Sequence, residues 1–164
     1  MESKSIILAA VLLIGVVLVS GCAYFTQDKD IDTTIPKRPI HWHPNLKIII
    51  NGEEQVIPND IGLGGGPGKI MDAHLSGMSM SPTHTHEEGD GTLHIENNNP
   101  SSKPETLTLG YFFKVWDKQF SATCIFEFCN DGEKKVTMTV NGKENTEFGK
   151  YVMHDKDEIV ITYS

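Results

Sequence analysis

The sequence predicts an α+β fold, a single β-rich domain of about six strands with one packed helix, over residues 39–164. Several short segments alternate apolar and polar residues, which is typical of half-buried strands. Asn-Gly pairs follow two of these segments, at Asn51 and at Asn141, and favour tight hairpin turns. One further segment has its apolar residues at helical spacing.

Residues 6–19 form an apolar run, IILAAVLLIGVVLV, of about the length of a signal-peptide core. The Val-Ser-Gly-Cys that ends at Cys22 resembles the lipobox of prokaryotic lipoproteins. This resemblance implies a signal peptide over 1–21 and a lipid-modified Cys22 at the outer face of the cytoplasmic membrane. The alternative is a single-pass N-terminal anchor, because Glu2 offsets the positive charge of Lys4. Both interpretations place the remaining chain outside the membrane.

Residues 22–38 are polar and interrupted by proline, so we expect a flexible tether between the lipid and the domain. The 164-residue chain has a formal net charge of −8. This acidity argues against a nucleic-acid partner, because phosphates would be repelled. The partner that the sequence predicts is the membrane, through Cys22. The sequence does not identify a protein partner.

Cys124 and Cys129 are the other two cysteines, and outside the cell such a pair predicts a disulfide. Five residues of continuous strand span about 16 Å, whereas bridged Cα atoms lie roughly 4.4–6.8 Å apart. A disulfide would therefore require the chain to bend between them. Two buried free thiols and a Cu(I)-thiolate site are the alternatives.

The first half of the domain predicts a hairpin and then a loop. Residues 46–50 and 53–57 alternate as two strands around Asn51-Gly52, and Pro58 ends the second. Residues 59–70 are glycine-rich but lack the spacing of a phosphate-binding loop. We therefore expect a mobile loop there. A further strand is predicted over residues 92–96.

The second half predicts the helix and three strands. Thr108 can cap a helix whose apolar stripe is Leu109, Phe112, Phe113 and Trp116. Alternation then predicts strands over residues 120–128, 135–140 and 158–163. A strand pair, a helix and the closing segment VNG…YVMHDKDEIVIT resemble β-grasp, ubiquitin-like domains, which implies a β-grasp-like sheet.

The histidines carry the main functional hypothesis. In an extended strand, residues at i and i+2 point to the same side, so His41 pairs with His43 and His84 with His86. The turn over residues 87–91 can return His94 to the second pair. Such imidazole clusters bind copper or zinc. We therefore expect His84, His86 and His94 to bind one ion, completed by His41 or His43.

Two further sets of residues accompany these histidines. Glu96 and Asp90 are candidates for hydrogen-bonding partners of the ligands or for competing ligands. The segment MxxHxxxMxM resembles methionine–histidine segments of extracytoplasmic copper carriers, which implies soft ligands for Cu(I) from Met71, His74, Met78 and Met80. The alternative is a loop whose methionines cover apolar surface.

Three functions remain open. The first is a lipid-anchored metal-binding protein that holds or passes copper or zinc at the membrane surface. The second is a zinc hydrolase in which Glu87, Glu88 or Glu96 activates a bound water. The third is a structural or partner-binding surface domain with histidines in ordinary hydrogen-bonding roles. No catalytic signature occurs in the sequence, so no catalytic residue is predicted.

The ordered motifs His41-Trp42-His43-Pro44, His84-Thr85-His86, GTLHIE (91–96) and TLGYFFKVW (108–116) resemble a group of uncharacterised secreted or membrane-attached prokaryotic domains. Their pattern runs HxHP, TH, GxIH[IV]E and TLGxFFxxW. The resemblance implies an extracytoplasmic domain and carries no activity with it. Asn45 stands where that group has another histidine, and Glu87-Glu88 replaces its aspartate.

Overall fold

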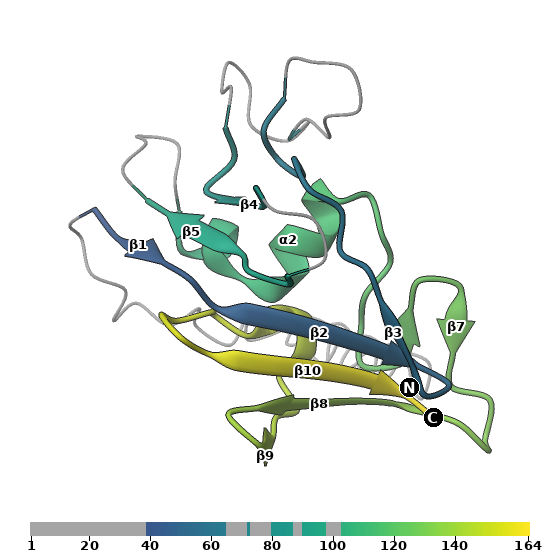
Figure 1. Cartoon of the computed structure of the whole chain (residues 1–164). Coiled ribbons are helices and arrows are strands. Elements are labelled where there is room, and N and C mark those ends of the chain that lie inside the picture. The colour runs from purple at the N-terminus through teal and green to yellow at the C-terminus, as the bar shows by residue number, and fades with distance from the viewer. Residues whose placement is uncertain (1–38, 65–71, 73–79, 87–89, 98–102) are drawn as a thin grey trace, which may run out of the picture. The chain divides into compact units, whose positions relative to one another are not determined.

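The domain is organised around a five-stranded mixed sheet with strand order β3-β2-β10-β8-β9. In this computed structural model, residues 39–64, 72, 80–86, 90–97 and 103–164 are described. The two central strands, β2 (Asn45–Ile50) and β10 (Glu158–Tyr163), run parallel and lie side by side in Figure 1. The others are antiparallel to their neighbours: β3 (Glu53–Gln55), β8 (Val136–Val140) and β9 (Lys143–Glu144).

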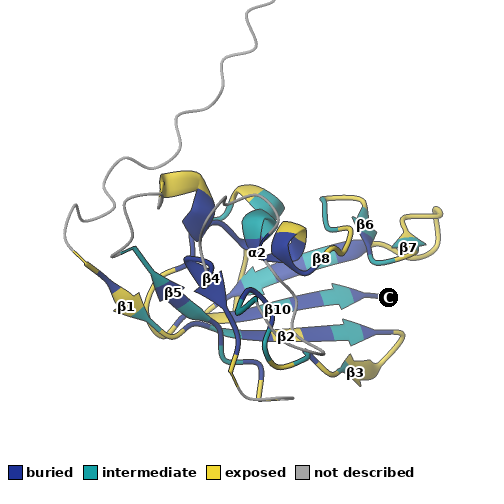
Figure 2. Ribbon diagram, turned by 90° about the horizontal axis from the view of Figure 1, so that it is seen from above, coloured by how far each residue is buried: buried dark blue, intermediate teal, exposed yellow. Residues whose placement is uncertain are grey.

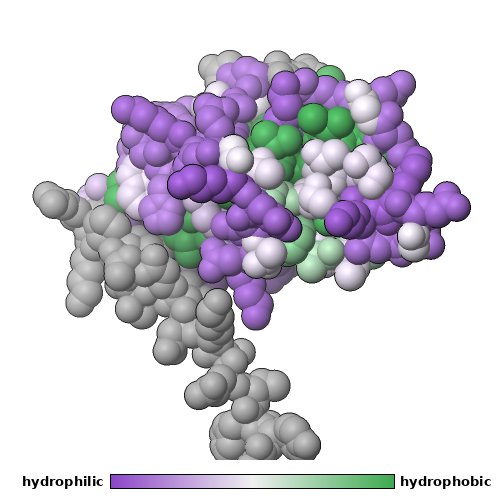
Figure 3. Space-filling view, turned by 90° about the horizontal axis from the view of Figure 1, so that it is seen from below, coloured by the Kyte–Doolittle hydropathy of each residue, from purple (hydrophilic) through white to green (hydrophobic). Residues whose placement is uncertain are grey.

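The alternation of apolar residues explains which face of this sheet is covered. Ile48, Ile161 and Met138 lie side by side on neighbouring strands, and each is at most 1% exposed. Residues that alternate with them along the strands, such as Ile49 and Val160, are half-buried and lie on the other face of the sheet. That outer face, seen from below in Figure 3, is mainly hydrophilic around a smaller apolar area.

Both hairpins of this sheet turn at the predicted Asn-Gly pairs. Asn51 and Gly52 have φ values of 53° and 85°, and Asn141 and Gly142 have 53° and 75°. Two successive positive φ values define the type I′ turn, whose twist matches that of the flanking strands. The sequence prediction of both turns is therefore confirmed.

The helix α2 (Leu109–Val115) covers the buried face of the sheet (Figure 1). Thr108 caps its first turn, with its side-chain oxygen accepting a hydrogen bond from the Tyr111 backbone N–H at 3.2 Å. The predicted stripe is buried, and Phe112 is completely so. Two short 3₁₀ helices, η1 (Pro104–Leu107) and η2 (Phe148–Lys150), lie beside α2.

A second, three-stranded antiparallel sheet has the order β1-β5-β4. It consists of β1 (His41–Trp42), β5 (His94–Glu96) and β4 (Thr83–His84). Hydrogen bonds join it to the large sheet where β2 begins, from Leu46 N to Gly91 O at 2.8 Å and from Leu93 N to Pro44 O at 2.9 Å. Figure 2 shows β4 buried and β1 largely exposed.

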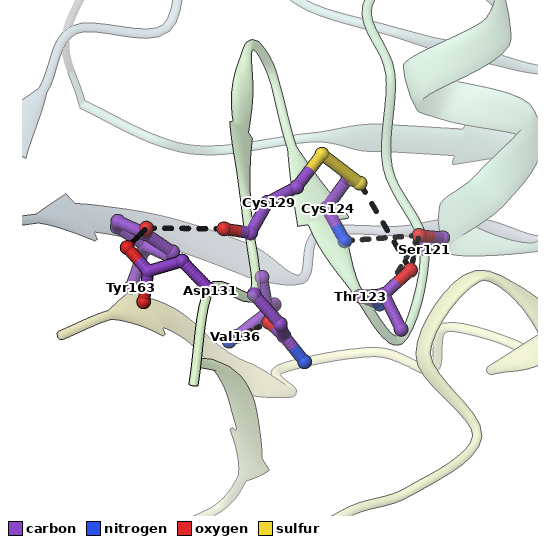
Figure 4. Close-up of a disulfide and its surroundings, with 8 residues drawn as sticks. Ser121, Thr123, Cys124, Cys129, Asp131, Val136 and Tyr163 are labelled. Atoms are coloured by element: carbon purple, nitrogen blue, oxygen red, sulfur yellow. Dashed lines mark hydrogen bonds between the residues drawn. A yellow bond between two sulfur atoms is a disulfide. The ribbon is translucent and has the colours of Figure 1, made fainter. Parts of the chain in front are cut away.

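The disulfide Cys124–Cys129 closes a hairpin of β6 (Cys124–Ile125) and β7 (Phe128–Cys129) (Figure 4). The predicted bend is present, and the two cysteines face each other with Cα atoms 4.0 Å apart. The prediction of one continuous strand over residues 120–128 is therefore wrong. The chain turns at Phe126, whose φ is 52°.

The predicted α+β class, with a β-rich domain and one packed helix, is confirmed. The described residues form ten short strands where about six were expected, because β1, β4 and β9 were not predicted and the expected strand over residues 120–128 is divided between β6 and β7. The β-grasp-like form of the sheet stays a prediction. Within the described part of the chain, no helix has the length and apolar character needed to span a membrane.

The prediction of a mobile loop over the glycine-rich residues 59–70 is wrong in part. Ile61 is fully buried and lies next to β4, because Thr85 N donates to Ile61 O at 3.0 Å. Gly62 O likewise accepts a hydrogen bond from Ser81 N at 2.7 Å. The beginning of this segment is therefore part of the packed domain, and residues 65–70 lie outside the described residues.

Candidate metal centre

The register of the three-stranded sheet places four polar side chains on one face. His84 pairs with His94, and His41 pairs with Glu96, in an antiparallel arrangement with β5 in the middle. Residues directly opposite each other in a sheet point to the same side. Ile95 points to the opposite, buried face with 0% exposure. The predicted face, with Leu93 and Ile95 toward the core and His94 away from it, is confirmed.

Five histidine rings gather on this face around His94. The ring centroid of His94 lies 4.5 Å from that of His86 and 4.8 Å from that of His43. It lies 5.4 Å from that of His84 and 5.9 Å from that of His41. The two i, i+2 pairs also contact internally, with centroids 4.6 Å apart for His41–His43 and 4.9 Å for His84–His86.

These rings form two groups that could hold a metal ion, and His94 belongs to both. We call His84, His86 and His94 the inner triad, and His41, His43 and His94 the outer triad. Within each triad the three ligand atoms lie within 4.8 Å of one another. The expectation of one site completed by a fourth histidine is thereby refined, because the structure groups the second pair separately around the same His94.

His84 is the most buried of these histidines, with 0% exposure. Its Nδ1 lies 2.9 Å from the carbonyl oxygen of Ser81. A carbonyl oxygen only accepts, so Nδ1 carries the proton and donates, which leaves a lone pair on Nε2. Among the described residues, this buried Nε2 has no hydrogen-bond partner. A buried nitrogen with a free lone pair and a fixed ring is what a metal ligand requires.

The protonation state of His84 agrees with this geometry. Burial lowers its pKa from 6.5 to about 4, and the neighbouring His86 and His94 act in the same direction. The Ser81 carbonyl and the Glu96 carboxylate oppose the shift without cancelling it. His84 is therefore neutral at physiological pH, and a metal ion would not have to displace a proton from it.

A hydrogen-bonded group behind His84 fixes Ser81. Asp72 is 4% exposed, and its carboxylate accepts hydrogen bonds from the Ser81 hydroxyl at 2.7 Å and from the Tyr111 hydroxyl at 2.8 Å. Burial and the bond to Asp72 raise the pKa of Tyr111, so its hydroxyl stays protonated and continues to donate. The helix α2 is thereby connected to the loop that orients His84.

Gly62 packs against the same loop from the other side. A Cβ atom built on it would lie 2.8 Å from Thr83 O and 3.1 Å from the His84 Cβ, and its φ is +78°. Only glycine accommodates both the left-handed backbone and this close approach. The sequence alone offered no signal for Gly62, Asp72 or Tyr111 as supports of the site, since their role depends on contacts across the fold.

His41 and His43, the two histidines that belong to the outer triad alone, are accessible. The His41 side chain is 60% exposed, and its Nε2 lies 3.3 Å from Oε1 of Glu96, whose side chain is 15% exposed. His43 is also exposed, and its backbone N–H donates to the Asp155 carboxylate at 3.0 Å. Glu96 therefore contacts His41, and its role as a partner of a metal ligand stays a prediction.

The remaining predicted residues divide into three sets. Asp90 is exposed, its side-chain Oδ1 accepts a hydrogen bond from Thr92 N at 2.8 Å, and its backbone oxygen accepts one from Asn45 Nδ2 at 2.8 Å. Met80 is described and 37% exposed. Several predicted residues lie outside the described residues: Cys22, Met71, His74, Met78, Glu87 and Glu88. The predicted ranges 1–21 and 22–38 lie there too.

His154 is a sixth described histidine that belongs to neither triad. Its ring stacks on Trp42 with centroids 5.5 Å apart, and its Nδ1 lies 3.6 Å from the Asp157 carboxylate. This structural role agrees with the ordinary interpretation of an isolated histidine. Its position near β1 also makes it a suitable control in experiments on the outer triad.

Comparisons of the whole chain with protein-family models, with curated proteins and with solved structures find no match. The function must therefore be argued from the site itself. Imidazole rings bind zinc, copper and nickel through a nitrogen lone pair. A cluster of such rings on neighbouring strands therefore suits a metal ion.

Proposed function

We propose that this domain binds a single first-row transition-metal ion, zinc or copper, through its histidine cluster, with the inner triad as the equilibrium site. The observation that carries the proposal is the buried Nε2 of His84, whose ring is oriented by the Ser81 carbonyl. Leaving a buried polar atom without a partner costs roughly 1–3 kcal/mol. A bound ion would recover this cost and use the lone pair.

The composition of the site supports borderline metals over hard ones. Ca²⁺ and Mg²⁺ take oxygen ligands, whereas the inner triad offers only nitrogen. Three histidines with an open position are a known arrangement for zinc, and the Irving–Williams order favours copper over zinc where both are present. The thioethers of Met71, Met78 and Met80 would extend the ligand set toward Cu(I).

The binding test is elemental analysis of the full chain purified without chelators, followed by titration with Zn(II), Cu(II) and Cu(I). We expect one ion per chain, and the His84→Ala/His86→Ala variant should lose this binding. Since His84 is buried, the single His86→Ala variant provides a version with an undisturbed interior, and His154→Ala controls for the loss of a histidine. Equal binding by the wild type and His84→Ala/His86→Ala would refute the proposal.

The titration also separates the kinds of metal protein. Cu(I) binding that weakens further in Met78→Leu/Met80→Leu would identify a copper carrier that holds or passes the ion. Zinc binding with hydrolysis of an ester or peptide would instead indicate the hydrolase alternative. Glu96 would then be the base to substitute, since its carboxylate lies on the histidine face of the small sheet.

We further propose that Cys22 anchors the chain by a lipid at the outer face of the cytoplasmic membrane, with residues 22–38 as a tether. The support is the apolar run over residues 6–19 followed by Val-Ser-Gly-Cys. The disulfide also belongs to an oxidising compartment. Mass spectrometry of membrane-extracted protein should find a lipid-modified Cys22 as the first residue. An intact Met1 would contradict the lipid anchor.

A further inference from the structure

We infer that the two triads act in sequence: the outer triad captures the ion from solution and hands it to the inner triad, with His94 remaining bound throughout. This inference rests on the proposed metal-binding function and adds a direction of movement within the site. It concerns a transition-metal ion that arrives as a hydrated ion or on a small, weak carrier.

The grouping of the ligand atoms requires two positions. Within each triad the ligand atoms lie within 4.8 Å of one another, but the five described histidines of the cluster do not form one such group. Metal–imidazole bonds are about 2.0–2.1 Å long, so ligand atoms must converge closely around an ion. One ion therefore cannot use all five rings of this arrangement at once, and His94 is the ligand that both positions share.

The exposure of the ligands gives the order of the two positions. His41 and His43, which belong to the outer triad alone, are both exposed, so an ion can reach them without any opening of the domain. The inner triad also has an exposed ligand, His86, but it includes His84, which is fully buried and whose Nε2 lies away from solvent. The outer triad is thus the more accessible position, and the inner triad is the one that offers a buried ligand.

Charge also favours arrival at the outer triad. The Glu96 carboxylate lies beside His41 with Nε2 and Oε1 3.3 Å apart, and it is the acidic group paired with β1 in the sheet. A carboxylate that accepts a hydrogen bond from one ring N–H leaves the other nitrogen free as a ligand and raises its basicity. Glu96 therefore prepares His41 for capture as well as attracting the cation.

The transfer itself is a ligand exchange without redox chemistry. The ion keeps its bond to His94, the bonds to His41 and His43 break, and bonds to His84 and His86 form. Each ring contributes one nitrogen lone pair, and the ion keeps its oxidation state, so no electron is transferred. Each departing ring is replaced by another ring, which means that the ion never has to leave as a fully hydrated species.

The experiment measures the kinetics of Cu²⁺ binding by the full chain in a stopped-flow instrument. Trp42 lies between His41 and His43 in the sequence, so quenching of tryptophan fluorescence by Cu²⁺ reports arrival of the ion at the histidine cluster. Four proteins are compared: the wild type, His41→Ala/His43→Ala, His86→Ala and the control His154→Ala. Equilibrium affinity is measured in parallel by competition with a chelator.

In the His41→Ala/His43→Ala variant, association and chelator-induced release should both slow by the same factor, because both pass through the outer triad. The dissociation constant should stay unchanged, because a lost intermediate alters both rates equally. His86→Ala should instead keep the fast quenching phase and lose affinity by at least about tenfold. The His154→Ala control should keep the wild-type affinity and rates, while its starting fluorescence differs because His154 stacks on Trp42.

Three results would overturn the inference while leaving metal binding by the histidine cluster intact. One is wild-type association in His41→Ala/His43→Ala, another is an equal loss of affinity in the variants of both pairs, and the third is two ions per chain at saturation. Absence of metal binding by the wild type would be a different result, because it would refute the proposed function itself.

Discussion

His84 and His94 face each other across neighbouring antiparallel strands, with their rings stacked 5.4 Å apart at an interplanar angle of 16°. One ring is fully buried and the other is half-buried. Two basic rings in such contact are compatible with stability only when at least one is neutral, and the low pKa of His84 satisfies this condition. The position of β4 therefore determines both where the His84 ring lies in the site and that this ring is uncharged.

Gly62→Ala should weaken metal binding as well as the fold, because the new methyl group would press on Thr83 and His84. The matched control is Gly142→Ala, which has a similar φ of +75° but no atom within 4 Å of the built Cβ. The control should cost about 1–2 kcal/mol for the left-handed backbone alone. Denaturation with chelator present and metal titration check both variants. Equal losses of stability in the two variants would show that β4 shifts to accommodate the new methyl group without affecting the domain.

The metal-free domain should lose stability as the pH falls from about 6.5 to about 4. Unfolded His84 binds a proton at its ordinary pKa of 6.5, whereas folded His84 does so only at about 4. The unfolded state thus binds more protons in this window, and acid favours it. The difference corresponds to roughly 3 kcal/mol, fully present as stability above pH 6.5 and lost below pH 4.

Urea denaturation at several pH values, with chelator present, measures this effect. The His84→Asn variant removes the titrating ring and retains an N–H donor for the Ser81 carbonyl, so its stability should vary much less over the same window. His154→Ala should keep the wild-type slope. A slope that persists in His84→Asn would assign the pH dependence to other groups.

Reducing the disulfide should lower stability without affecting metal binding. The crosslink spans a sequence separation of 5. The loop-entropy relation for so short a loop gives about 2 kcal/mol. In both Figures 1 and 2 the β6–β7 hairpin lies at the opposite end of the domain from β1 and β5. Cys124→Ser/Cys129→Ser should therefore show a lower unfolding midpoint and an unchanged dissociation constant for the metal.

Phe112→Ala should destabilise the domain by roughly 3–5 kcal/mol, because the ring is fully buried between the helix and the sheet. Lys114→Ala, on the exposed side of the same helix, serves as the control and should cost less than about 0.5 kcal/mol. Chemical denaturation of both variants tests the prediction. Similar values for the two would mean that the helix contributes little to the core.

The parts of the fold that depend on local patterns were predictable. Period-two alternation located β2, β8 and β10, the Asn-Gly pairs located both hairpin turns, and Thr108 located the start of α2. The alternation through Phe126 was misleading, because the segment is folded back on itself and crosslinked. Its turn contains neither glycine nor proline, so no local signal marked it.

The candidate site was predictable in its histidines and not in their arrangement. The i, i+2 spacing identified both histidine pairs, and the strand of His94 was recognised from Leu93 and Ile95. That β5 lies between β1 and β4 follows from strand pairing far apart in the sequence, which no local pattern encodes. This order makes His94 common to both triads, and it also brings Asp72 and Tyr111 behind Ser81.

The parallel pairing of β2 with β10 sets the time at which the site can mature during synthesis. Asn45, two residues after His43, donates its backbone N–H to Asp157 O at 2.8 Å, and Asp155 holds His43 itself. A nascent chain that has not yet reached residue 163 lacks the strand against which β2 is ordered. Such long-range pairing forms late. The outer triad is therefore a property of the finished chain, and an ion offered to a growing polypeptide would meet unorganised histidines.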